Sequence, residues 1–81
     1  MNHYVIAYDV RKGSRLVFEA FGPEAGAEAL RRRFDLEATY SGNPDVEVVI
    51  LGGPDEAALR VTHKRYFADL DELVKATTLA S

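Results

Sequence analysis

The chain has 81 residues, with 13 acidic and 10 basic side chains and a formal net charge of −3. A chain this short forms a single domain around one small core, so we expect one domain over residues 1–81 with a frayed tail at 76–81. The absence of cysteine excludes disulfides and cysteine-based zinc sites, and the acidic balance disfavours non-specific nucleic-acid binding.

The first predicted element is a strand over residues 3–10, whose sequence HYVIAYDV is rich in β-branched and aromatic residues. Side chains alternate between the faces of a strand, so Tyr4 and Ile6 share one face and Val5 and Ala7 the other. Both faces of this strand are therefore expected to be apolar.

A hairpin is predicted next, because RKGS supplies turn chemistry and Gly13 is free to adopt positive φ. The segment RLVFEAF, residues 15–21, then returns as a second strand. Asp9 closes the first strand, and we expect it to support the turn, paired with Arg11 or Arg15.

The segment GPEAGAEALRRRFDLEA predicts a helix with Gly22 at its N-cap and Pro23 at its first helical position. Arg31 and Asp35 are spaced for an i,i+4 ion pair. The Arg31–Arg33 run projects in three directions about 100° apart, so it does not form one basic patch. The predicted core face is an apolar stripe at helical spacing: Pro23, Ala27, Leu30 and Phe34.

The third strand is predicted over residues 46–52, where VEVVILG is almost continuously apolar, as in a strand that is covered on both sides or lies centrally. A second helix follows Gly53 and Pro54, and we expect it to run from Asp55 to about Lys75. Its predicted apolar stripe comprises Leu59, His63, Tyr66, Phe67, Leu70, Leu73 and Val74.

This ββαβα order predicts an α+β fold: a two-layer sandwich of a three-stranded mixed sheet with two helices on one face. A right-handed strand–helix–strand crossover would make the second and third strands parallel. We favour the strand order 2-1-3, because the first strand is apolar on both faces and suits a central place. The order 1-2-3 is the alternative.

The segment YVIAYDV resembles the opening strand of the CRISPR-associated Cas2 family. The resemblance implies that Asp9 matches an Asp at a proposed metal-dependent nuclease site of that family. The family continues directly into a helix in a βαββαβ order, whereas this chain turns at Gly13 into a second strand. The resemblance covers only these residues, and we carry over no activity from it.

His63 lies near the centre of the second helical stripe, with no carboxylate three or four residues away on the same face. A lone histidine lacks the convergent partners that a catalytic or metal site requires. We interpret it as a core residue and predict no catalytic residue, cofactor or metal. The alternative is a small enzyme or ligand binder around His63, Tyr66 and Asp9.

A second alternative is a nucleic-acid-binding accessory protein, which the net charge disfavours. Its candidate patch combines basic residues of the hairpin with those of the second helix: Arg11, Lys12, Arg15, Arg60 and Lys64. We favour solvated faces for these residues, because long basic side chains commonly cover the edge of a core.

The favoured function is a non-enzymatic interaction module that forms a homodimer or binds a protein partner. A helix of about 30 Å would overhang strands of about 23 Å, and an uncovered sheet face would leave further apolar surface in water. The candidate interface comprises these residues: Val5, Ala7, Leu70, Leu73 and Val74.

The N-terminus lacks the basic segment, apolar core and cleavage site of a signal peptide. No apolar run approaches the about 20 residues needed to span a bilayer. We therefore expect a cytoplasmic protein without membrane contact. The excess of Arg over Lys is typical of a high-GC bacterial or phage genome.

Overall fold

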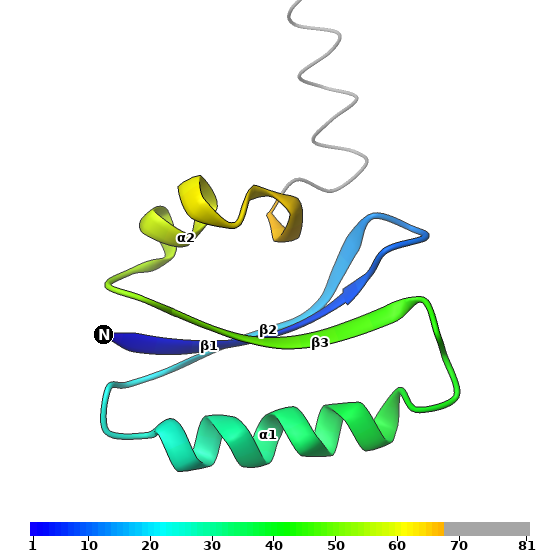
Figure 1. Cartoon of the computed structure of the whole chain (residues 1–81), viewed down its shortest axis with the longest axis horizontal. Coiled ribbons are helices and arrows are strands. Elements are labelled where there is room, and N and C mark those ends of the chain that lie inside the picture. Colours follow the sequence, from blue (N-terminus) through cyan, green and yellow to red (C-terminus); the bar gives the residue numbers. More distant parts are fainter. Residues whose placement is uncertain (68–81) are drawn as a thin grey trace, which may run out of the picture.

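The computed structural model describes residues 1–67. The three strands lie close to their predicted bounds, whereas both helices differ from prediction. The elements in chain order are β1 (Asn2–Asp9), β2 (Ser14–Phe21), α1 (Gly26–Thr39), β3 (Val46–Gly53), α2 (Glu56–Thr62) and the 3₁₀ turn η1 (Lys64–Tyr66) (Figure 1).

The strands form one sheet in the order β2-β1-β3, and β1 is antiparallel to both neighbours. The predicted order 2-1-3 is confirmed. The prediction of a mixed sheet is wrong, because β2 and β3 run in the same direction but β1 separates them. Both pairs of hydrogen-bonded neighbours, β1 with β2 and β1 with β3, are therefore antiparallel.

The helices lie on opposite faces of the sheet, with α1 below it and α2 and η1 above it in the view of Figure 1. The predicted two-layer sandwich with both helices on one face is wrong, and the described chain has three layers. The α2 face buries a cluster of Tyr4, Ile6, Tyr8, Leu59, Tyr66 and Phe67, and the α1 face buries Val5, Ala29 and Leu36.

Strand β1 explains this arrangement, because it carries apolar side chains on both faces and each face requires a cover. Val5, Ile6 and Ala7 are all 0% exposed. Val5 and Ala7 therefore do not lie on an open sheet face, and that premise of the predicted interface is wrong.

The β1–β2 hairpin follows the prediction at its turn, where Gly13 has a φ of 63°. This left-handed backbone favours glycine, since other residues place Cβ close to the backbone there. The Gly13 amide donates to the Asp9 carbonyl at 2.8 Å and closes the turn.

Helix α1 begins at Gly26 and packs through the side opposite to the predicted one. Ala29 and Leu36 are buried, whereas Leu30 and Phe34 are exposed. The helix crosses the sheet closely at its start, where a Cβ on Gly26 would lie 3.4 Å from His3 Nε2. Ala29 and Leu36 pack in one core cluster with Val5 of β1, so the face with Leu30 and Phe34 points outward.

The segment before α1 also differs from the prediction. Gly22 and Pro23 lie in a turn that the Ala25 amide closes by donating to the Gly22 carbonyl at 3.0 Å. The N-cap is Ala25, which has no side-chain capping bond.

Helix α2 begins as predicted but is short. Its N-cap Asp55 accepts a hydrogen bond from the Ala58 amide at 2.8 Å. The helix ends at Thr62, and His63 leaves the helical backbone with φ −127° and ψ 51°. A continuous helix to Lys75 is therefore wrong from this point.

The break after α2 turns two aromatic side chains onto the sheet. Tyr66 meets Tyr8 edge-on with ring centroids 5.5 Å apart, and Phe67 meets Phe18 edge-on at 5.6 Å. The predicted interface residues Leu70, Leu73 and Val74 and the predicted tail at 76–81 lie outside the described residues.

The two leucines of α1 provide a matched test of its orientation. We expect Leu36→Ala to lower the free energy of unfolding by about 2–5 kcal/mol, as for other buried leucines. Leu30→Ala removes the same atoms from an exposed site, so it should cost much less in dilute solution. Urea denaturation of both variants measures the difference, and the reverse ranking would contradict this helix orientation.

Candidate interaction surface

An apolar stripe runs along the side of α1 that faces away from the sheet. We call Ala27, Leu30, Phe34 and Ala38 the outer stripe; all four are exposed. Leu30 is 43% and Phe34 58% exposed, and they lie one helical turn apart. Single exposed apolar residues are common on protein surfaces, whereas a contiguous group on one helix face indicates a contact site.

Arg31 and Asp35 lie along one edge of the outer stripe, and Glu37 and Arg33 lie along the other edge. The predicted ion pair between Arg31 and Asp35 is not formed in the described part of the chain. The ion pairs of α1 among residues 1–67 are instead Arg33 with Glu37 at 2.8 Å and Arg32 with Glu19 at 2.7 Å. Both Arg31 and Asp35 are exposed. Two opposite charges therefore border the stripe without an ion-pair partner among residues 1–67.

The Arg32–Glu19 pair links the inner side of α1 to strand β2. Arg32 Nε donates to Glu19 Oε2, and this hydrogen bond raises the pKa of Arg32 above its ordinary value. Together with buried Ala29 and Leu36, it favours the rotation of α1 that leaves the outer stripe in solvent.

Two members of the predicted basic patch converge on one aromatic ring. The guanidinium carbons of Arg15 and Arg60 lie 5.1 and 5.0 Å from the centre of Phe67. Arg15 also donates to the Tyr66 carbonyl at 3.0 Å, and Arg60 pairs with Glu56 at 3.3 Å. These arginines help to hold the segment after α2 against the hairpin.

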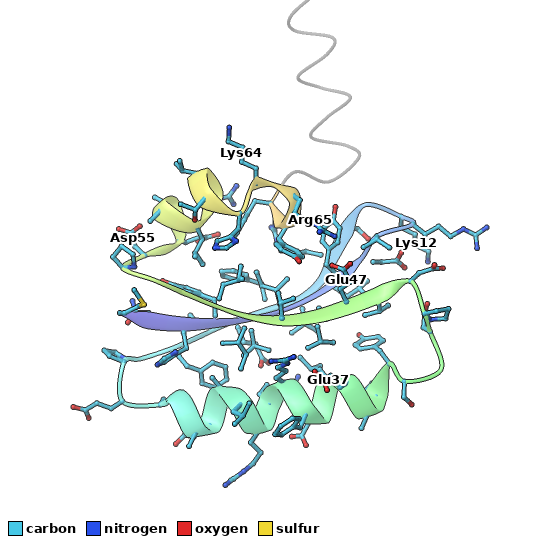
Figure 2. The ribbon with its side chains drawn as sticks, in the orientation of Figure 1. Lys12, Glu37, Glu47, Asp55, Lys64 and Arg65 are labelled. Atoms are coloured by element: carbon cyan, nitrogen blue, oxygen red, sulfur yellow. The ribbon has the colours of Figure 1, made fainter. Side chains whose placement is uncertain are left out.

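The other members of that patch lie apart. Figure 2 shows Lys12 projecting from the hairpin tip and Lys64 projecting from the α2–η1 layer, away from the sheet. Arg11 is exposed on the hairpin turn. The structure thus unites Arg15 with Arg60 but does not gather the predicted residues into one basic surface.

Asp9 supports the hairpin, as predicted, but through backbone amides rather than arginine side chains. Its Oδ1 accepts hydrogen bonds from the Arg11 and Lys12 amides at 3.0 and 2.9 Å, and the residue is 5% exposed. Among residues 1–67, no group of three or more His, Cys, Asp or Glu side chains could hold a metal ion. Asp9 therefore has a structural explanation within the turn.

His63 joins α2 to η1 through its backbone. Its amide donates to the Leu59 carbonyl at 2.7 Å, and its carbonyl accepts from the Tyr66 amide at 3.1 Å. The residue is half-buried, at the point where the chain leaves the helix. These contacts give it a place in the fold that requires no ligand.

Glu47 on β3 anchors the neighbouring η1 turn, which was not predicted. Its Oε2 accepts from Arg65 at 2.9 Å and from the Tyr66 hydroxyl at 3.2 Å, and Figure 2 shows Arg65 directed toward it. Burial raises the pKa of Tyr66, and the charge and hydrogen bond of Glu47 raise it further, while Arg65 opposes them. The feature of the sequence that pointed to this contact is Glu47, the single charged residue in the otherwise apolar segment VEVVILG.

The chain was compared with protein-family models, curated proteins and solved structures, and none of the three comparisons gave a match. Within residues 1–67, no helix has both the length and the apolar character needed to cross a membrane.

The hairpin contact of Asp9 leads to a prediction with a matched control. Asp9→Ala removes the acceptor of two amides, and we expect a loss of about 1–3 kcal/mol in the free energy of unfolding. Asp9→Asn keeps an Oδ1 acceptor and should lose clearly less. Thermal and urea unfolding test this, and equal losses for the two variants would contradict the amide contacts.

Tyr66 predicts a dependence of stability on alkaline pH. Its raised pKa means that the folded state holds the phenolic proton more tightly than the unfolded state, whose value is about 10. The resulting stability is present below that value and is lost as the pH rises through the folded pKa. Tyr66→Phe should therefore show a shallower loss of stability above about pH 10; parallel curves in urea denaturation would contradict this.

Proposed function

We propose that the chain is a non-enzymatic protein-interaction module of the cytoplasm and that the outer stripe of α1 is its contact surface. The observation that carries the proposal is the exposure of Leu30 and Phe34 on a helix whose other side already packs on the sheet.

The energetics of α1 support this function. Fully burying one large apolar side chain contributes about 1.5–3 kcal/mol relative to leaving it in water. In the chain alone, α1 gains this from Leu36, while Phe34 stays largely in solvent. A partner that covers the outer stripe would therefore gain free energy without rearranging the fold, as when an apolar helix face docks on another surface.

The alternatives have less support. The Asp9 carboxylate accepts hydrogen bonds from the hairpin amides, and the Tyr66 hydroxyl donates to Glu47. Both groups proposed to join His63 in a ligand site are therefore already used within the fold. Arg15 and Arg60 contact Phe67, so a nucleic-acid surface would compete with these internal contacts. The interaction module uses a surface that no described element covers.

Photo-crosslinking can locate the contact surface directly. A photoreactive phenylalanine analogue would replace Phe34 in one variant and Val61, which is 69% exposed on α2, in the control. We expect adducts to a protein, either a second copy or another chain, from position 34 and few from position 61. Each adduct partner would be identified by mass spectrometry, purified and titrated against the chain with and without Phe34→Ser.

Several outcomes would overturn this proposal. They are the absence of adducts at position 34, equal adducts at both positions, and a crosslink from position 34 back into the same chain. Low-salt binding of a labelled oligonucleotide that Phe34→Ser leaves unchanged would instead support the nucleic-acid alternative.

A further inference from the structure

We propose that the partner of the outer stripe is a second copy of this chain, with the two α1 helices packed antiparallel across a twofold axis. This inference rests on the proposed function and specifies the partner. It also specifies which residues of the two helices lie level with each other, from the positions of Arg31 and Asp35 on one edge of the stripe.

On the edge that carries Arg31 and Asp35, the charge pattern is self-complementary in that register, while Arg33 on the other edge is paired with Glu37 of its own chain. About 100° per residue places Arg31 and Asp35 along the same edge of the outer stripe, one turn apart. A twofold axis perpendicular to the helices brings this edge against the same edge of the second copy, in the reverse direction. When the axis passes level with Arg33, each Arg31 faces Asp35 of the second copy, and two equivalent ion pairs form.

The apolar side chains fit the same register. Leu30 then lies level with the gap between Phe34 and Ala38 of the second copy, as a knob enters a hole in antiparallel helix packing. Ala27 lies almost level with Ala38 of the second copy at each end of the contact. These small residues allow the helices to approach closely while the two Phe34 rings meet near the axis.

A parallel arrangement would not satisfy the charges. A twofold axis parallel to the helices places each residue level with the same residue of the second copy. Arg31 is then level with the other Arg31 and Asp35 with the other Asp35, so the opposite charges are not brought together. The antiparallel register uses the two bordering charges that have no ion-pair partner within residues 1–67. A different partner protein would have no need of this self-complementarity.

The expected dimer is reversible. Helix α1 has 14 residues, or about 21 Å at 1.5 Å per residue. A contact of this length is smaller than a standard interface, which buries about 1,200–2,000 Å² in total. We therefore expect a monomer–dimer equilibrium that shifts with concentration rather than a permanent dimer.

Disulfide trapping tests the direction of packing, since the chain contains no cysteine that could interfere. Ala27→Cys and Ala38→Cys would be prepared as separate full-length variants, with the exposed Val61→Cys as the control. Mild oxidation of an Ala27→Cys and Ala38→Cys mixture should give the mixed dimer in preference to either homodimer. Homodimers of each variant in preference to the mixed one would indicate parallel packing and overturn the proposal.

Charge reversal tests the register in the chain without cysteine. Arg31→Asp alone and Asp35→Arg alone each place like charges across the interface, so sedimentation should show weaker dimerisation by at least several-fold. The double variant restores opposite charges and should recover the dimer. A dimer whose dissociation constant is unchanged in all three variants, such as one paired through the outer edge of β2 or β3, would contradict the register.

Failure of this inference differs from failure of the proposed function. A chain that remains monomeric at millimolar concentration, yet crosslinks another protein from position 34, would overturn only the second copy as partner. A monomeric chain without such adducts would overturn both.

Discussion

The burial of β1 on both of its faces dictates how the other elements are arranged. This strand lies at the centre of the sheet, and its side chains from Tyr4 to Tyr8 are buried on alternating faces. Each face needs its own cover in a chain this short, so α1 serves one and α2 with η1 the other (Figure 1). Each cover is consequently a single thin layer, and its outer side is left in contact with solvent.

The same constraint explains how much of the fold could be predicted from the sequence. The strands and the turn at Gly13 depend on local patterns, and the central place of β1 follows from its apolar residues on both faces. That pattern also requires a cover on each face. Both helices were nevertheless predicted on one face, with the other face left to a second copy or a protein partner. No glycine or proline in the sequence signals the break at His63. The break coincides with the packing of Tyr66 and Phe67 on the sheet, which is a contact between distant parts of the chain.

The candidate site was also only partly predictable, because α1 carries two apolar stripes. Periodicity grouped Leu30 and Phe34 on one face, and this face was wrongly predicted to meet the sheet in place of the one with Ala29 and Leu36. The packing of Ala29 and Leu36 on Val5 distinguishes the two, and Val5 comes from a distant part of the chain. Self-association was expected from the sequence through the open sheet face and the end of the second helix, whereas the surface proposed from the structure is the outer side of α1.

Association through the outer side of α1 can be tested by NMR on dilution. Amide resonances of the isotope-labelled chain would be followed from millimolar to low micromolar concentration. We expect the resonances of α1 residues around Leu30 and Phe34 to shift, while those of β1 and α2 stay unchanged. Shifts confined to the edge strands β2 or β3, with α1 unaffected, would contradict it.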